Sequence, residues 1–355
     1  MLIFESQREA RGRTLRLLLA FGLTVLLLVI AVNAALALAV GVCWSFWVPG
    51  AGYPRYFFEV NTAVTLLFVL GGWWVETSRL SKGGQALAEQ MGARLAQPGT
   101  HFEERRFAHI VDEMAIAAGM KRPAAMVMAR DLGINAFAAG WDEDDAVVAV
   151  TSGALEFLSR EELQGLVAHE FSHIREGDTR LNMRLVGMVF GLEMLFRMGQ
   201  DLVPSDVRED RSPVLAVLGL ALMAAGWLGW VAGHALQAAV SRQREFLADA
   251  RAVQWTRSRD GLGGVLRKVM TQWNEGVESR RVGSVVQHLL LVGTEQGGMA
   301  HWFDSHPSLE ERVRRIYGRR MEPLPLERIG EPDAPRGDTT PPAPAGVVAP
   351  GWTLG

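Results

Sequence analysis

The stretch that decides the fold is Val167-Ala-His-Glu-Phe-Ser-His-Ile-Arg-Glu-Gly-Asp178, which contains the pattern His-Glu-x-x-His. Ser159 is followed three residues later by Glu162, a capping-box pattern that predicts the start of a helix just before it. His169 and His173 then lie one turn apart on one helix face and can offer two imidazole nitrogens to one metal ion. A buried histidine pair without a metal is the alternative, because the motif alone also occurs by chance.

Neighbouring acidic residues extend this pattern. Glu170 lies about 100° around the helix from His169, so it can reach a metal-bound water without being a ligand. Later in the chain, Ser241-Arg-Gln-Arg-Glu-Phe-Leu-Ala-Asp249 places Glu245 and Asp249 one helical turn apart. Glu245 would complete the His2Glu ligand set of a catalytic zinc site, and Asp249 could hold the far nitrogen of a histidine ligand. Taken alone, this acidic pair also fits a charged, solvated helix face.

Composition predicts a membrane protein. The 355 residues are 49% hydrophobic, and the 36 basic and 39 acidic residues are scattered along the chain. This distribution lacks the basic stripe of a nucleic-acid-binding protein, so we expect no nucleic-acid partner. With a single cysteine, the chain can form neither an internal disulfide nor a cysteine-based zinc cluster.

Four apolar segments predict membrane helices. Leu17 to Val42 has no charged residue and exceeds the ~20 residues that cross a bilayer, and a second segment runs from about Phe57 to Val75. Pro213 to Ala239 is a further span, whereas Leu181 to Leu202 carries charges and is either a span or a partly embedded helix. Basic residues flank the first pair of segments, so the positive-inside rule places both ends of that hairpin in the cytoplasm. A cleavable signal peptide, the alternative for the first segment, would have a shorter apolar core.

Between and after these segments the sequence predicts a folded domain. His101 to Gly119 has the apolar period of a core helix. Short strands are expected at Ala124 to Met128, Ile134 to Ala138 and Ala146 to Thr151, ahead of the helix that carries the histidines. Val282 to Gly293 is apolar but too short to span, so we expect it to be a core helix.

Taken together, these motifs resemble the HtpX/CAAX-protease family of integral-membrane zinc metallopeptidases, a gluzincin group, and are nearer to bacterial HtpX because the spans are few. The resemblance covers roughly Arg122 to Tyr317. It runs through four blocks, which are Asn135-Ala-Phe-Ala138 with its following hairpin, Val148 to Asp178, Ser241 to Ala250 and Ser305 to Arg312.

The resemblance implies one zinc ion per chain, held by His169, His173 and Glu245. It assigns Glu170 as the general base and acid of peptide hydrolysis. Asp249 would orient His169. A zinc ion in such a site activates water and polarises the scissile carbonyl, so no covalent intermediate is expected.

Two further roles follow from the resemblance. An extended substrate would pair with the edge strand formed by Asn135, Ala136, Phe137 and Ala138. Such pairing recognises the backbone of the substrate more than its amino-acid sequence. His306 would help to stabilise the oxyanion, with a loop or helix-capping role as its alternative. The expected fold class is an α-helical membrane protein with an α+β gluzincin metallopeptidase domain, about four transmembrane helices and a small sheet whose edge strand lies beside the active-site helix.

The predicted units are a transmembrane hairpin (1–80), the first part of the catalytic domain (81–180), a second membrane hairpin (181–240), the second part of the catalytic domain (241–320) and a Pro-rich disordered tail or linker (321–355). The predicted function is a zinc endopeptidase in a bacterial-type inner membrane, with its active site on the cytoplasmic side. Its expected substrates are membrane or misfolded proteins, as in protein quality control. The alternatives are a catalytically silent zinc-binding scaffold and a transporter built on the intramembrane charges, and both self-cleavage and homo-oligomer formation stay open.

Overall fold

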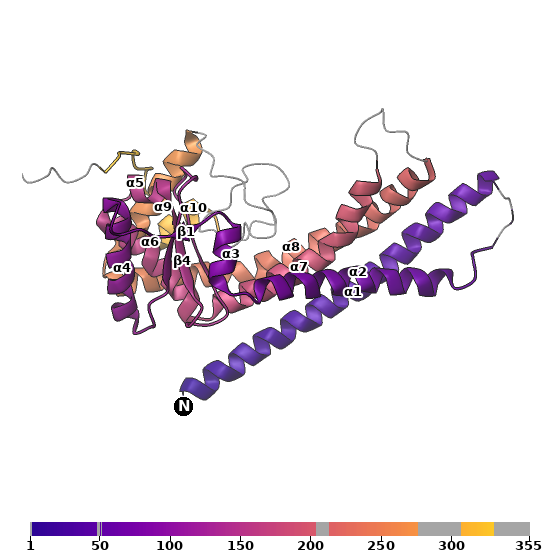
Figure 1. Cartoon of the computed structure of the whole chain (residues 1–355), viewed down its shortest axis with the longest axis horizontal. Helices are drawn as coiled ribbons and strands as arrows, with labels where there is room; N and C mark the ends of the chain where they lie inside the picture. Colours follow the sequence, from indigo (N-terminus) through magenta and orange to yellow (C-terminus); the bar gives the residue numbers. More distant parts are fainter. Residues whose placement is uncertain (1, 48–49, 51, 204–212, 276–306, 330–355) are drawn as a thin grey trace, which may run out of the picture.

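The computed structural model describes residues 2–47, 50, 52–203, 213–275 and 307–329. Long helices project from a folded part of the chain (Figure 1), and they are α1 (Leu2–Trp47), α2 (Phe57–Leu80), α7 (Asp178–Leu202) and α8 (Pro213–Thr256). Three segments are long and apolar enough to cross a membrane, namely Leu19–Val42, Phe57–Leu80 and Pro213–Leu236. Many large apolar side chains of α1, α2 and α8 are exposed, as lipid-facing helices require.

Helix α7 packs between α2 and α8. A Cβ atom on Gly191 of α7 would lie 2.4 Å from the carbonyl oxygen of Val69 in α2, and one on Gly226 of α8 would lie 2.5 Å from the backbone nitrogen of Phe196. Glycine at these positions lets the helix backbones approach closely, as in membrane bundles. Charged residues keep α7 outside the set of three apolar candidate spans. Its crossing of the membrane therefore stays a prediction.

Two of the long helices lead directly into the folded part. Helix α8 is continuous over 44 residues, so the boundary predicted at residue 240 lies inside a helix. Glu245 and Asp249 therefore stand on the same helix as the candidate span. Helix α7 begins at Asp178, only three residues after α6 (Arg160–Arg175) ends.

The sheet of the folded part has four strands in the order β1-β2-β4-β3. They are β1 (Arg94–Leu95), β2 (Ala124–Met128), β3 (Ala136–Ala139) and β4 (Val147–Thr151). Strand β2 pairs parallel with β4, while β1 and β3 pair antiparallel with their neighbours. Strand β3 is therefore an edge strand, as the sequence analysis expects, and it contacts α6.

Helices cover this sheet and enclose the core. They are α3 (Gly84–Gln90), α4 (Phe102–Ala118), α5 (Ser152–Phe157), α6, α9 (Arg259–Asn274) and α10 (Leu309–Tyr317). Helix α6 begins at the predicted capping box, because the Ser159 hydroxyl accepts from the Glu162 amide and the Glu162 carboxylate accepts from the Ser159 amide. Apolar side chains such as Phe107, Leu166 and Leu262 are fully buried between α4, α6 and α9. The helix with the histidines is thus held on several sides.

Most of the expected elements of the folded part are confirmed, with two differences. The second predicted strand begins at Ile134, whereas β3 begins at Ala136, because Asn135 turns its side chain to its own chain and accepts a hydrogen bond from the Ala136 amide. Residues 321–329, predicted as the start of a disordered tail or linker, lie against α9 and α5. The predicted helix at Val282 to Gly293 and the tail from residue 330 onward lie outside the described residues.

Candidate metal centre

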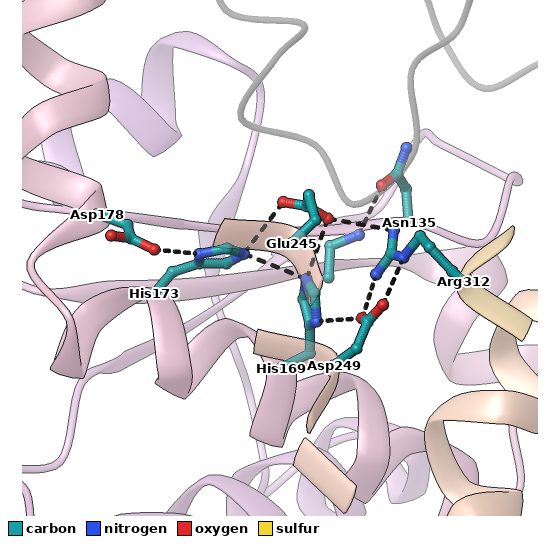
Figure 2. A network of polar contacts seen from close by, with 8 residues as sticks. Asn135, His169, His173, Asp178, Glu245, Asp249 and Arg312 are labelled. Atoms are coloured by element: carbon teal, nitrogen blue, oxygen red, sulfur yellow. Dashed lines mark hydrogen bonds and ion pairs between the residues drawn. The ribbon is translucent and has the colours of Figure 1, made fainter. Parts of the chain in front are cut away.

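Two histidines of α6 and one glutamate of α8 meet in the interior, as the sequence analysis expects. The Nε2 atoms of His169 and His173 are 3.2 Å apart. A carboxylate oxygen of Glu245 lies 3.4 Å from Nε2 of His173, and the other lies 3.6 Å from Nε2 of His169. Contact between α6 and α8 brings these ligand atoms together from distant parts of the chain (Figure 2).

The spacing of these three groups fits a zinc ion. Zinc bonds of about 2.0 to 2.1 Å, arranged tetrahedrally, hold neighbouring ligand atoms about 3.3 to 3.4 Å apart. The measured separations lie on both sides of that value. Two imidazoles and one carboxylate form a ligand set typical of catalytic zinc, which leaves a fourth position for water or substrate. The chain therefore supplies both the donor atoms and the geometry of such a site.

Each histidine is held from its other ring nitrogen by a carboxylate. Oδ1 of Asp249 lies 3.1 Å from Nδ1 of His169, as expected from the sequence. Oδ2 of Asp178, at the start of α7, lies 3.0 Å from Nδ1 of His173. These contacts turn both Nε2 atoms toward Glu245 (Figure 2). A carboxylate at the far nitrogen fixes the tautomer and the ring orientation of a metal-binding histidine.

Two arginines complete the polar network, and the sequence analysis gave neither a role. Arg312 of α10 is fully buried, donates to both carboxylate oxygens of Asp249 at 2.9 and 2.7 Å, and lies 3.2 Å from Glu245. Arg244 of α8 forms an ion pair with Asp178. Both arginines lie in stretches rich in charged residues. In such a stretch, the sequence does not distinguish a buried, paired arginine from a solvated one. Only the packing of α10 and α8 against α6 distinguishes them.

The burial of this network moves the pKa values of its members. Burial raises the pKa of Glu170 to about 7. It lowers the pKa of His169, whereas for His173 the carboxylate of Glu245 outweighs burial and raises the pKa. For Asp249, burial favours the neutral form, but the positive charge of Arg312 prevails and lowers the pKa. A carboxyl group with a pKa near neutrality can both accept and deliver a proton.

Glu170 also connects the histidine helix to the edge strand. Its buried carboxylate interacts with the backbone amide of Ala138 in β3. Ala136 and Ala138 are buried in the same core cluster as the α6 side chains, whereas Phe137 is buried on the opposite face of the sheet, and Asn135 is buried just before the strand. The segment expected to pair with substrate therefore lies next to the residue expected to act as base. His306, the remaining predicted site residue, lies outside the described residues.

A membrane metalloprotease requires metal ligands close to its membrane helices. Here two histidines of one helix are completed by a carboxylate from α8, a helix that also contains a candidate membrane span. Comparison with known families agrees. The model of peptidase family M48 matches residues 101–320, and the chain belongs to this family. The match includes α6, the part of α8 that carries Glu245, and α10.

Individual relatives extend the similarity beyond the folded part. A protease HtpX homolog of Ligilactobacillus salivarius is 31% identical over 294 residues, which are 81% of this chain and 94% of that protein. The protease HtpX homolog of Streptococcus gordonii is 30% identical over 323 residues, or 89% of this chain and 99% of the relative. That of Dictyoglomus thermophilum is 37% identical over 210 residues, covering 59% of this chain and 67% of the relative. The chain is thus of the HtpX type over most of its length.

Proposed function

We propose that this protein is a zinc endopeptidase that cleaves membrane or misfolded proteins at the cytoplasmic face of a bacterial-type inner membrane. The observation that carries the proposal is the triangle of His169, His173 and Glu245 beside Glu170, whose pKa is raised to about 7. A bound zinc ion would supply a Lewis acid for the scissile carbonyl and lower the pKa of water to roughly 7.

The residues of the chain have distinct roles in this mechanism. Glu170 takes the proton of the attacking water and later delivers it to the leaving amine, a function for which a pKa near neutrality is suited. His169 and His173 are held by the carboxylates of Asp249 and Asp178, so their rings keep one orientation during turnover.

The substrate class follows from the surroundings of the site. Edge strand β3 would pair with an extended polypeptide by backbone hydrogen bonds, next to the Glu170 carboxylate that contacts Ala138. Helices α7 and α8 lead from the site along the bundle of candidate spans. A substrate segment that emerges from the membrane beside these helices would therefore lie close to β3. This favours membrane proteins as substrates and a role in quality control.

Two other functions are weaker. A catalytically silent zinc-binding scaffold would have no chemical need for Glu170, which is present and buried beside the ligands. A transporter built on intramembrane charges would rest on Arg184, Glu193 and Arg197. Glu193 and Arg197 instead form an ion pair with each other at 2.6 Å, and Glu193 lies 3.7 Å from His234 of α8. Glu193 is therefore accounted for by an ion pair within α7 and by its burial in the protein.

The decisive experiment compares Glu170→Gln with Glu161→Gln in detergent-purified protein, measuring zinc per chain and cleavage of casein. Glu161 is exposed on the same helix and serves as the matched control. We expect Glu170→Gln to keep one zinc ion and to lose about 10²- to 10⁴-fold in rate, because it removes the general base. A Glu170→Gln protein as active as the control would disprove the proposed role, and parent protein without zinc would disprove the proposed metal.

The orientation in the membrane has a separate test. Glu161→Cys in a Cys43→Ser background gives a single thiol on α6, since Cys43 is the only cysteine. A membrane-impermeant maleimide should label this thiol in lysed cells and spare it in intact spheroplasts. Equal labelling in both preparations would place the site on the outer side.

A further inference from the structure

A tight turn joins the histidine helix α6 to helix α7, and both of its carboxylates are contacted by α8. The turn is Glu176-Gly177, and Asp178 is the first residue of α7. Gly177 has a φ of 70°, a left-handed conformation that glycine adopts without strain. This turn brings the Asp178 carboxylate back to within 3.0 Å of the His173 ring on α6.

The carboxylate of Asp178 bridges a metal ligand and an arginine. Its Oδ2 atom lies beside Nδ1 of His173 (Figure 2), and its Oδ1 atom forms an ion pair with Arg244 of α8. The side chains of Asp178 and Arg244 are only 5% and 15% exposed. Solvent therefore screens this pair weakly. Because each oxygen has its own partner, the carboxylate is held in one orientation.

The other histidine is held in the same manner. Oδ1 of Asp249 lies 3.1 Å from Nδ1 of His169, and the same carboxylate accepts from Arg312 at 2.9 and 2.7 Å. Each ligand histidine is thus followed by an aspartate and then by an arginine. The two arginines come from different helices, α10 and α8. In both chains of contacts, the guanidinium offsets the charge of a buried carboxylate.

We propose that Arg244 is a positioning residue for zinc binding, which acts through Asp178 on His173. The inference rests on the proposed function, because it concerns the zinc ion of that site. Without the guanidinium, the Asp178 carboxylate would be a buried charge that has lost its cationic partner, and it would turn toward water. His173 would then lose the group that fixes its ring, and ordering the ring again would weaken zinc binding.

Helix α8 offers a matched control. Arg251 lies two turns farther along the same helix and pairs with Glu176 at 2.6 Å. Its ion pair therefore fastens the same turn to α8. In the described part of the chain, no hydrogen bond or ion pair joins Glu176 to a histidine. Arg251→Met consequently removes an ion pair of the turn while leaving Asp178 with both of its partners.

Zinc affinity tests this role in the full-length protein in detergent, by competition with a chromogenic chelator. We expect Arg244→Met to weaken zinc binding about 10-fold, the lower end of the range for groups that orient a metal ligand, because Arg244 acts through a second side chain. Arg251→Met should leave the affinity unchanged. Arg244→Lys should restore most of the loss, since lysine returns a positive charge beside Asp178.

A second comparison separates action through Asp178 from a general effect on the fold. In an Asp178→Asn background, Arg244→Met should cause no further loss of zinc affinity, because the group through which Arg244 acts is already removed. Asparagine also removes the unpaired buried charge, so this comparison holds even if Arg244→Met alone is unstable. A urea titration of each variant restricts the affinities to folded protein.

Equal zinc affinity in the parent and in Arg244→Met would overturn the inference. A loss of the same size in Arg251→Met would also overturn it, as would a further 10-fold loss from Arg244→Met in the Asp178→Asn background. These outcomes leave the proposed function intact, because the parent still binds zinc. A parent protein that binds no zinc would instead refute the metal of the proposed function, and this inference with it.

Discussion

Replacing Arg312 by methionine should destabilise the folded part of the protein strongly. The guanidinium is fully buried and makes two hydrogen bonds to Asp249 and a close contact with Glu245. Methionine preserves much of the volume but leaves the Asp249 carboxylate in the interior without its cationic partner, with Nδ1 of His169 still beside it. Removing one partner of a buried ion pair costs about 3 to 5 kcal/mol of unfolding free energy. We expect a loss of that size in Arg312→Met.

A second substitution separates charge from packing. In Arg312→Met combined with Asp249→Asn, the unpaired charge at position 249 is absent while that of Glu245 remains, so about half of the lost stability should return. Arg314→Met is the matched control on the same helix, because the Arg314 side chain is 55% exposed and forms an i,i+3 ion pair. Exposed pairs contribute at most about 1 kcal/mol.

Urea titration in detergent, followed by tryptophan fluorescence, measures these differences. Trp255 packs against the core of the folded part and contributes to this signal. A chelator is kept in all samples, because zinc binding would add its own stabilisation. The reasoning is refuted if Arg312→Met costs no more than Arg314→Met, or if the double variant is no more stable than Arg312→Met alone.

Three further outcomes are expected. Asp178→Ala should weaken zinc affinity about 10- to 100-fold in a competition assay with a chromogenic chelator, because the carboxylate orients His173. Glu104→Gln should lower the free energy of unfolding by about 1.5 to 3 kcal/mol in a urea titration, since the carboxylate accepts charge-assisted hydrogen bonds from Arg94. Arg94 lowers the pKa of Glu104. This stabilisation is therefore present above the ordinary pKa of 4.5 and should disappear as the pH falls through the lowered pKa. Gly191→Val should reduce the melting temperature in detergent, whereas Gly71→Val should not, because only the first added side chain meets a neighbouring backbone.

Local patterns were sufficient to predict the helix that carries the histidines. Ser159 and Glu162 mark its start, and the four-residue spacing of His169 and His173 places both on one face. These features depend on residues within one or two turns of each other, so backbone geometry alone determines them. The same is true of the long apolar segments, whose length and composition define candidate spans without reference to the rest of the chain.

Contacts between distant segments of the chain were harder to predict from the sequence. The sequence placed Glu245 and Asp249 on a common helix face, and the family resemblance named the histidines as their partners. The distances between these groups are set by the packing of α8 against α6, which the sequence does not show. Asp178 and Arg312 illustrate what was missed. Each lies among other charged residues in the sequence. The sequence there does not show that Asp178 contacts a histidine or that Arg312 contacts a carboxylate in the interior.

By itself, the sequence determined the elements of this protein and the chemistry available to them. It defined the apolar helices, the capped helix with its two histidines and base, and the acidic pair that follows the last span. The tertiary structure alone decided which atoms meet. It set the three ligand groups within 4.8 Å of one another and closed the network with the buried Arg312. The physical reason is that helix formation depends on neighbouring residues, whereas the position of a ligand depends on how whole helices pack.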